Sequence, residues 1–219
     1  MSLSKHKSQN NDQLFPAAGK IRVTILASEW GSSKGGLSTL NREFAIQLAK
    51  FPELQISFFV PQCSEEDKKA ALSHNIEIVQ AKRRPGYDEL EWLSFPPAQL
   101  QIDVVVGHGV KLGHQAQVIR ESRKCKWIQV VHNDPEELGM FKTYQNSIST
   151  GEKKRQTEVE LCEMADLIVG VGPKLYEAFR RYLRSCKKDE SILDITPGVF
   201  NEFVSIKHVE KDKIGRAHV

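Results

Sequence analysis

The sequence predicts a doubly wound α/β fold, in which a mainly parallel sheet carries helices on both faces. Two observations support this prediction: short apolar runs rich in β-branched residues recur along the chain, and helical patterns separate them. Such regular alternation of strand and helix is typical of parallel sheets covered by helices. No repeat with a period of about 20–50 residues is present, so a solenoid is not indicated.

The first elements follow from apolar spacing. Residues 21–27 (IRVTILA) form a continuous apolar, β-branched run, as expected of a strand that is buried on both faces. A glycine-rich turn over 31–36 follows, and apolar residues at helical spacing then predict a helix over 37–50. Residues 55–60 (QISFFV) predict the second strand, which Pro61 closes.

The middle of the chain continues this alternation. We predict a helix over 65–73, a strand over 76–80 (IEIVQ) and a short helix over 87–93. A strand over 103–107 (DVVVG) and a helix over 112–123 come next.

The last third repeats the pattern. We predict a strand over 126–132 (KWIQVVH) and a long helix over 152–164 with Lys and Glu on its outer face. A strand over 167–171 (LIVGV) precedes a helix over 173–183, whose initial proline is tolerated in a first helical turn. The last strand is expected over 191–196 (SILDIT). We therefore expect one domain over 20–203, with a disordered leader over 1–19 and a tail over 204–219.

Composition excludes several classes of protein. The chain has 219 residues with 31 Lys+Arg and 28 Asp+Glu, and a net charge of +3 is too weak to indicate nucleic acid as a partner. No window of about 18 apolar residues predicts a transmembrane helix, and no secretory signal opens the sequence. The cysteines are widely spaced and no N-x-[ST] sequon occurs, which suits a reducing, cytoplasmic compartment. We expect all four cysteines to be small buried hydrophobes.

The glycine loop after the first strand is the first candidate site. Gly35, Gly36, Leu37 and Ser38 open the first helix, where free N–H groups and the helix dipole favour a phosphate or a sugar. A P-loop would need a lysine where Leu37 stands, and the G-x-x-x-G-G spacing differs from the dinucleotide fingerprint G-x-G-x-x-G. Neither NTP hydrolysis nor NAD binding is therefore indicated, while a turn that merely caps the helix stays an alternative.

Two histidines follow neighbouring predicted strands. His108 precedes Gly109 after the fourth strand, and His132 precedes Asn133 after the fifth. Ligands of open α/β sheets bind beyond the carboxyl ends of the strands, and imidazole can donate to or accept from a sugar hydroxyl. A zinc site that includes His114 lacks the metalloprotease spacing, so no metal is expected. A simple turn after the fifth strand stays open, because Asn, Asp and Pro follow one another there.

Two further features have weaker implications. No G-x-S-x-G nucleophile elbow occurs, so an α/β-hydrolase is not supported. Basic runs at 82–84, 153–155 and 180–188 are interpreted mainly as solvated faces, with a membrane-surface or phosphate role as the minority alternative.

Five segments, in order, match the motifs of one family. They are the Gly35-Gly36 turn, DVVVGHG at 103–109, VVH at 130–132, EMADLIVGV at 163–171 and TPGVF at 196–200. Together they resemble the N-terminal domain of GT-B glycosyltransferases of family GT4, the glycosyl transferase group 1 type, over about residues 20–203. Two positions depart from the family pattern, since Gly172 stands where serine is frequent and Pro197 where asparagine is usual.

This resemblance implies transfer of a sugar from a nucleotide-sugar to an acceptor with retention of configuration. It implies that His132 is catalytic and contacts the transferred sugar, and that His108 lines the acceptor side. The substrate- and diphosphate-binding residues would be Gly35, Gly36, Leu37, Ser38, His108, Gly109 and Asn133. Helix dipoles and basic side chains would hold the diphosphate, so the resemblance implies neither a metal nor a cofactor beyond the nucleotide-sugar co-substrate.

The family's donor-binding C-domain, with its E-x7-E carboxylates, has no counterpart after Val199 in this sequence. We therefore expect the isolated chain to bind a nucleotide-sugar weakly and not to turn it over, and we expect the donor to be shared with such a C-domain. The acceptor is unknown, and neither nucleic acid nor a membrane span is expected. A glycosyltransferase-like recognition module without catalysis, within a larger protein, is the alternative hypothesis.

Overall fold

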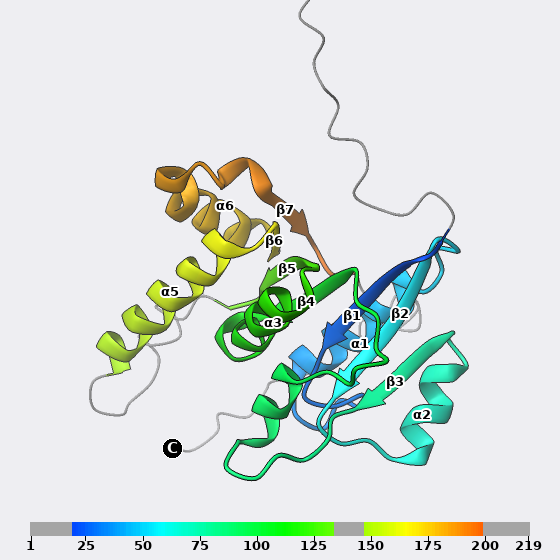
Figure 1. Cartoon of the computed structure of the whole chain (residues 1–219). Coiled ribbons are helices and arrows are strands. Elements are labelled where there is room, and N and C mark those ends of the chain that lie inside the picture. The colour runs from blue at the N-terminus through cyan, green and yellow to red at the C-terminus, as the bar shows by residue number, and fades with distance from the viewer. Residues whose placement is uncertain (1–18, 134–146, 199–219) are drawn as a thin grey trace, which may run out of the picture.

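The computed structural model describes residues 19–133 and 147–198. Within them, seven parallel strands form one sheet in the order β3-β2-β1-β4-β5-β6-β7 (Figure 1). The strands are β1 Ile21–Leu26, β2 Leu54–Val60, β3 Ile76–Gln80, β4 Val104–His108, β5 Lys126–Val131, β6 Leu167–Val171 and β7 Ile192–Ile195. The predicted doubly wound α/β fold is confirmed.

Helices connect these strands. The α-helices are α1 Gly36–Leu48, α2 Glu65–Leu72, α3 Gly109–Arg123, α5 Ser147–Met164 and α6 Pro173–Tyr182. The described residues also form the short 3₁₀ helices η1 Glu89–Ser94, η2 Leu183–Cys186 and η3 Asp189–Ser191. The predicted short helix over 87–93 is therefore a 3₁₀ turn, and α3 and α5 begin earlier than the predicted 112 and 152.

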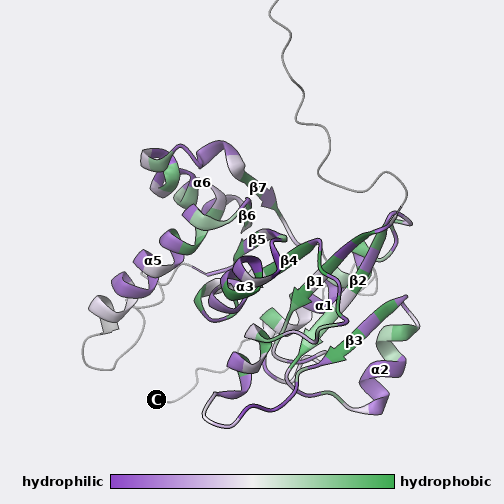
Figure 2. Cartoon of the chain, in the orientation of Figure 1, coloured by the Kyte–Doolittle hydropathy of each residue, from purple (hydrophilic) through white to green (hydrophobic). Residues whose placement is uncertain are grey.

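Alternate residues of the strands face two separate hydrophobic layers. Ile25, Phe58 and Val106 pack with Ala45 of α1 and Ala71 of α2 on one face. Their strand neighbours on the other face pack with α3, α5 and η1, and a third cluster fills the space between α6 and β6. Figure 2 shows α5 as largely hydrophilic, which fits a helix with one narrow buried face. The two-layer cover explains why the strands read as continuous apolar runs.

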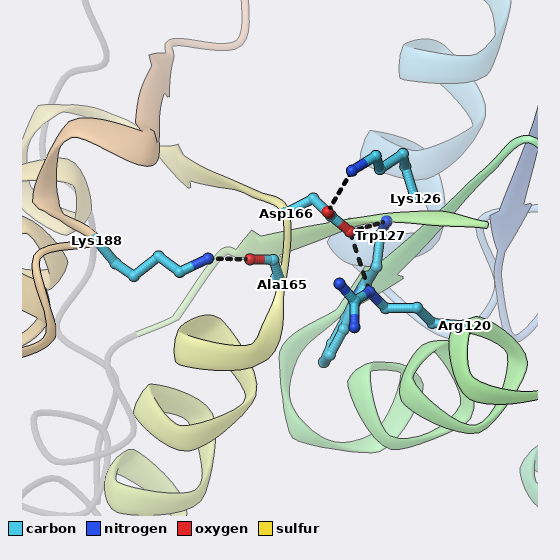
Figure 3. Close-up of polar contacts among 6 residues, drawn as sticks. All are labelled: Arg120, Lys126, Trp127, Ala165, Asp166 and Lys188. Carbon is cyan, nitrogen blue, oxygen red and sulfur yellow. Dashed lines mark hydrogen bonds and ion pairs between the residues drawn. The ribbon is translucent and has the colours of Figure 1, made fainter. Parts of the chain in front are cut away.

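Asp166 fixes the start of β6 against β5 and α3 (Figure 3). Its Oδ2 accepts hydrogen bonds from Arg120 Nε and from the backbone N–H of Trp127, both at 3.0 Å. Its Oδ1 accepts a hydrogen bond from Lys126 Nζ at 2.9 Å. Lys188 donates to the carbonyl of the neighbouring Ala165 at 2.8 Å. The family-like EMADLIVGV stretch is therefore where three elements are joined.

The cysteines only partly match their predicted burial. Cys125 and Cys162 are buried, Cys63 is half-buried, and all four thiols are free. The prediction is wrong for Cys186, which is exposed because it ends η2 at the surface.

The predicted leader and tail lie outside the described residues, apart from Gly19. Across the described residues, no helix has both the length and the apolar content that crossing a membrane requires.

Candidate functional site

The glycine loop and the two predicted histidines lie at one edge of the sheet. β4 lies between β1 and β5, with Ile25 paired to Val106 and His108 paired to Val130. Because all three strands are parallel, the residues that follow them emerge side by side at the carboxyl edge. The structure thus brings together segments that are about a hundred residues apart in sequence.

The end of the glycine loop is open to solvent. Gly35 precedes the first residue of α1 with a φ of 112°, a conformation that favours glycine. A Cβ added at Gly35 or at Gly36 would meet no described atom within 4 Å. Both backbones are therefore accessible to a ligand at the N-terminus of a 13-residue helix.

The next residues turn inward. Leu37 is half-buried, and Ser38 is buried with its hydroxyl 3.5 Å from that of Ser28. Asn41, also buried, donates from Nδ2 to the carbonyl of Leu26 at 3.5 Å. Ser38 and Asn41 thus attach α1 to the end of β1, and the predicted contact of Ser38 with a diphosphate stays a prediction.

His108 is buried at the junction of β4 and α3. Its side chain has 3% exposure, and neither ring nitrogen has a hydrogen-bond partner among the described residues. Burial, reinforced by the neighbouring His132, lowers the pKa of His108 to about 3. The ring is therefore neutral at pH 7, with one nitrogen able to donate and the other able to accept.

His132 follows β5 and is half-buried, with Asn133 exposed next to it. Its ring centroid lies 6.3 Å from that of His108. Burial lowers the pKa of His132, and a hydrogen bond with the Val130 backbone partly opposes this shift. Two neutral imidazoles thus lie side by side at the carboxyl edge of β4 and β5.

Gly109 lets His132 approach the start of α3. Its φ is +56°, and a Cβ there would lie 3.1 Å from His132 Cε1 and 3.8 Å from Glu158 Oε1. Gln129 holds this backbone by donating from Nε2 to the Gly109 carbonyl at 2.8 Å.

Glu158 is a further residue beside the histidines that the sequence motifs do not indicate. It is 2% exposed on α5, although the helix reads as a charged outer surface. The signal was its spacing: Glu158 precedes Leu161, Cys162 and Ala165 by three, four and seven residues, which places it on their buried face.

His114 is not part of this group. It is exposed on α3, six residues after His108. Among the described residues, no three His, Cys, Asp or Glu side chains group closely enough to hold a metal ion.

A groove of about 850 Å³ runs from the glycine loop along α1 to the end of β7. Its walls include Gly36, Thr39 and Leu40 on one side and Thr196, Pro197 and Gly198 on the other. The structure therefore places two of the family-like segments, the Gly35-Gly36 turn and the start of TPGVF, against the same hollow.

Comparison with protein families gives one match over most of the chain. A model described as Family 4 Glycosyltransferase in conflict systems, GT4-conflict, matches residues 24–218. A search of the curated proteins finds no match.

Several solved structures have the same fold. Sucrose-phosphate synthase from Thermosynechococcus elongatus matches with a TM-score of 0.61 and 14% identity, over 82% of this chain and 49% of that chain. Anabaena Alr3699/HepE in complex with UDP and glucose matches with a TM-score of 0.57 and 11% identity, over 82% of this chain and 45% of that chain. Phytolacca americana UGT2 complexed with UDP-2fluoro-glucose and pterostilbene matches with a TM-score of 0.53 and 10% identity, over 85% of this chain and 56% of that chain. These identities show the fold alone, and the chain spans about half the length of each structure.

Proposed function

Because this chain belongs to the family 4 glycosyltransferases of conflict systems and matches about half of GT-B structures, we propose that it is the acceptor-side half of a retaining glycosyltransferase. The proposed reaction transfers a sugar from a nucleotide-sugar to a hydroxyl of an acceptor. The rest of the donor site would come from a second domain facing the carboxyl edge of this sheet.

The pair of neutral histidines at the carboxyl edge that also carries the glycine loop is the observation that favours this function most. A sugar presents hydroxyls that both donate and accept, and a neutral imidazole can pair with either kind. The ring nitrogens of His108 are buried without partners among the described residues. A hydrogen bond from a bound sugar would relieve this, since an unsatisfied buried polar group costs about 1–3 kcal/mol. In this proposal His132 contacts the transferred sugar, and His108, Gly109 and Asn133 line the acceptor side.

The glycine loop supplies the matching anion site. The exposed backbones of Gly35 and Gly36, at the positive end of the α1 dipole, would approach the donor diphosphate. Leu37 and Ser38, which follow these glycines and are half-buried and buried, complete the proposed diphosphate site. The complexes of HepE with UDP and glucose and of UGT2 with UDP-2fluoro-glucose support a nucleotide-sugar as the donor for this fold.

A substitution of His132 tests the proposal. In the natural full-length protein that carries this chain, transfer or hydrolysis is measured with UDP- and GDP-sugars. We expect His132→Ala to lower kcat by about 100-fold or more, as removal of a group that acts on the reacting centre does. The matched control is His114→Ala, which removes an exposed histidine from α3 and should leave the rate unchanged.

A full-length protein with active wild type and equally active His132→Ala would refute the role of His132. If calorimetry detects no binding of any nucleotide-sugar to the full-length protein, the recognition-module hypothesis replaces the enzyme.

A further inference from the structure

Glu29 ties the glycine loop to the end of β1. Its Oε1 accepts a hydrogen bond from the backbone N–H of Lys34, and its Oε2 accepts one from the Ser33 hydroxyl. Lys34 adds a second link, because its Nζ donates to the Ser28 carbonyl at 3.3 Å. One carboxylate therefore closes the loop between Gly31 and Gly35 into a compact turn.

The base of this loop is buried and well packed. Trp30, the residue after Glu29, is 5% exposed and packs edge-on against Phe58 with ring centroids 5.1 Å apart. Glu29 is thus held beside a buried anchor while its carboxylate reaches the loop. Burial opposes its charge, but the bonds from Ser33, Lys34 and Ser38 outweigh this and lower the pKa of Glu29. The carboxylate is therefore ionised at pH 7.

The loop needs such a tie. It reads Gly-Ser-Ser-Lys-Gly-Gly, and glycine loses more conformational entropy on ordering than any other residue. A ligand that had to order a loose loop would lose that free energy from its affinity, whereas a preformed loop avoids the loss. The carboxylate also takes up the N–H of Lys34, the residue before Gly35, whereas a Cβ at Gly35 or Gly36 would meet no described atom within 4 Å.

We propose that Glu29 is a positioning residue, which holds the glycine loop in the shape that presents Gly35 and Gly36 to the donor diphosphate. This inference rests on the proposed function. An opposite effect on donor affinity is also conceivable, because the negative charge of a carboxylate near a diphosphate repels it. The two effects predict opposite changes in affinity when Glu29 is replaced.

The test compares Glu29→Ala with Glu29→Gln in the natural full-length protein. Calorimetry measures binding of UDP-glucose and GDP-mannose, and hydrogen exchange measures protection of the amides of residues 31–36 without ligand. Ala removes both acceptors, so we expect loop exchange and the donor Kd each to rise about tenfold, the effect of one or two lost hydrogen bonds. Gln keeps an oxygen for the Lys34 N–H and should stay within about threefold of wild type.

The matched control is Glu53→Ala, which removes an exposed carboxylate just before β2, at the opposite edge of the sheet. It should change neither quantity. In an active protein, Glu29→Ala should raise KM for the donor more than it lowers kcat, and Gln should restore both.

Unchanged loop protection in Glu29→Ala overturns the positioning role, whatever the protein binds. Tighter donor binding in both variants overturns it in favour of charge repulsion. If the wild type binds neither nucleotide-sugar, the proposed function fails, while the exchange data still show whether Glu29 orders the loop.

Discussion

At the scale of single residues, the carboxyl edge depends on a glycine that brings a helix and a histidine together. Gly109 is the first residue of α3, and its φ of +56° is costly for any residue with a Cβ. The same missing Cβ leaves room for the ring of His132. Backbone conformation and side-chain placement are therefore coupled at this one position.

Gly109→Ala should destabilise the chain more than the same substitution at a glycine that also has a positive φ but no close neighbours. Gly86 has a φ of +83°, and a Cβ there would meet no described atom within 4 Å. Urea unfolding should show a loss of about 1 kcal/mol for Gly86→Ala, from backbone strain alone, and of about 2 kcal/mol or more for Gly109→Ala. Equal losses would contradict the close contact between Gly109 and His132.

The sequence predicts these site residues unevenly, for a physical reason. His108 and His132 are found because each directly follows an apolar strand, and parallel strands end at a common edge. Glu29 and Glu158 are missed because the function of a carboxylate depends on what it contacts. Glu29 bonds to residues four and five positions later, and Glu158 meets α3 only through tertiary packing.

At the scale of elements, the carboxylate of Asp166 joins β6 to β5 and to α3 (Figure 3). Burial opposes its ionisation, but the hydrogen bonds from Arg120, Lys126 and the Trp127 backbone outweigh burial and lower the pKa of Asp166. A lowered pKa means that the folded state stabilises the ionised carboxylate more than the unfolded state does.

Asp166→Asn should lower the free energy of unfolding by about 1–2 kcal/mol at pH 7, a modest value because Arg120 and Lys126 are partly exposed. This contribution is present above the unfolded pKa of about 3.9 and is lost as the pH falls through the lower folded value. The gap between wild type and variant should therefore close below about pH 4. Asp194→Asn, at an exposed position of β7, is the control. A gap that persists at pH 2.5 would contradict the ionic explanation.

Element bounds show where sequence patterns are sufficient. The strands at 76–80 and 167–171 match their predicted bounds, because the turn residue Asn75 precedes the first and Gly172 follows the second. α3 begins at Gly109, before the predicted 112, because Gly109 and Gly113 are poor helix formers that hide its first turn in the sequence. Tertiary packing overrides that propensity: a Cβ at Gly113 would lie 2.9 Å from the Gln129 amide, so glycine lets α3 approach β5 closely.

At the scale of the whole molecule, several buried polar atoms of the sheet and of α1 have no hydrogen-bond partner among the described residues. Thr24, Asn41, His108, Trp127, Gln129 and His132 each carry such an atom, and of these His108 ends β4 and His132 follows β5 at the carboxyl edge. A fold optimised for stability alone would not keep such a set, since each group costs free energy when left unpaired. Under the proposed function, a bound sugar would give the ring nitrogens of the two histidines hydrogen-bond partners.

This arrangement should make the whole fold sensitive to mild acid. Unfolded histidine titrates near pH 6.5, whereas burial keeps His108 neutral in the folded chain down to a pKa of about 3. Between these values the unfolded state binds a proton that the folded state does not, so stability falls as the pH falls, by up to about 1.4 kcal/mol per unit. His108→Gln removes this linkage, so its unfolding free energy should decline less between pH 6.5 and 4.5, by about 2 kcal/mol in urea titrations. His114→Gln, at an exposed position of α3, should keep the wild-type dependence of unfolding free energy on pH. If the curves of unfolding free energy against pH run parallel for wild type and His108→Gln, then His108 is protonated in the folded chain.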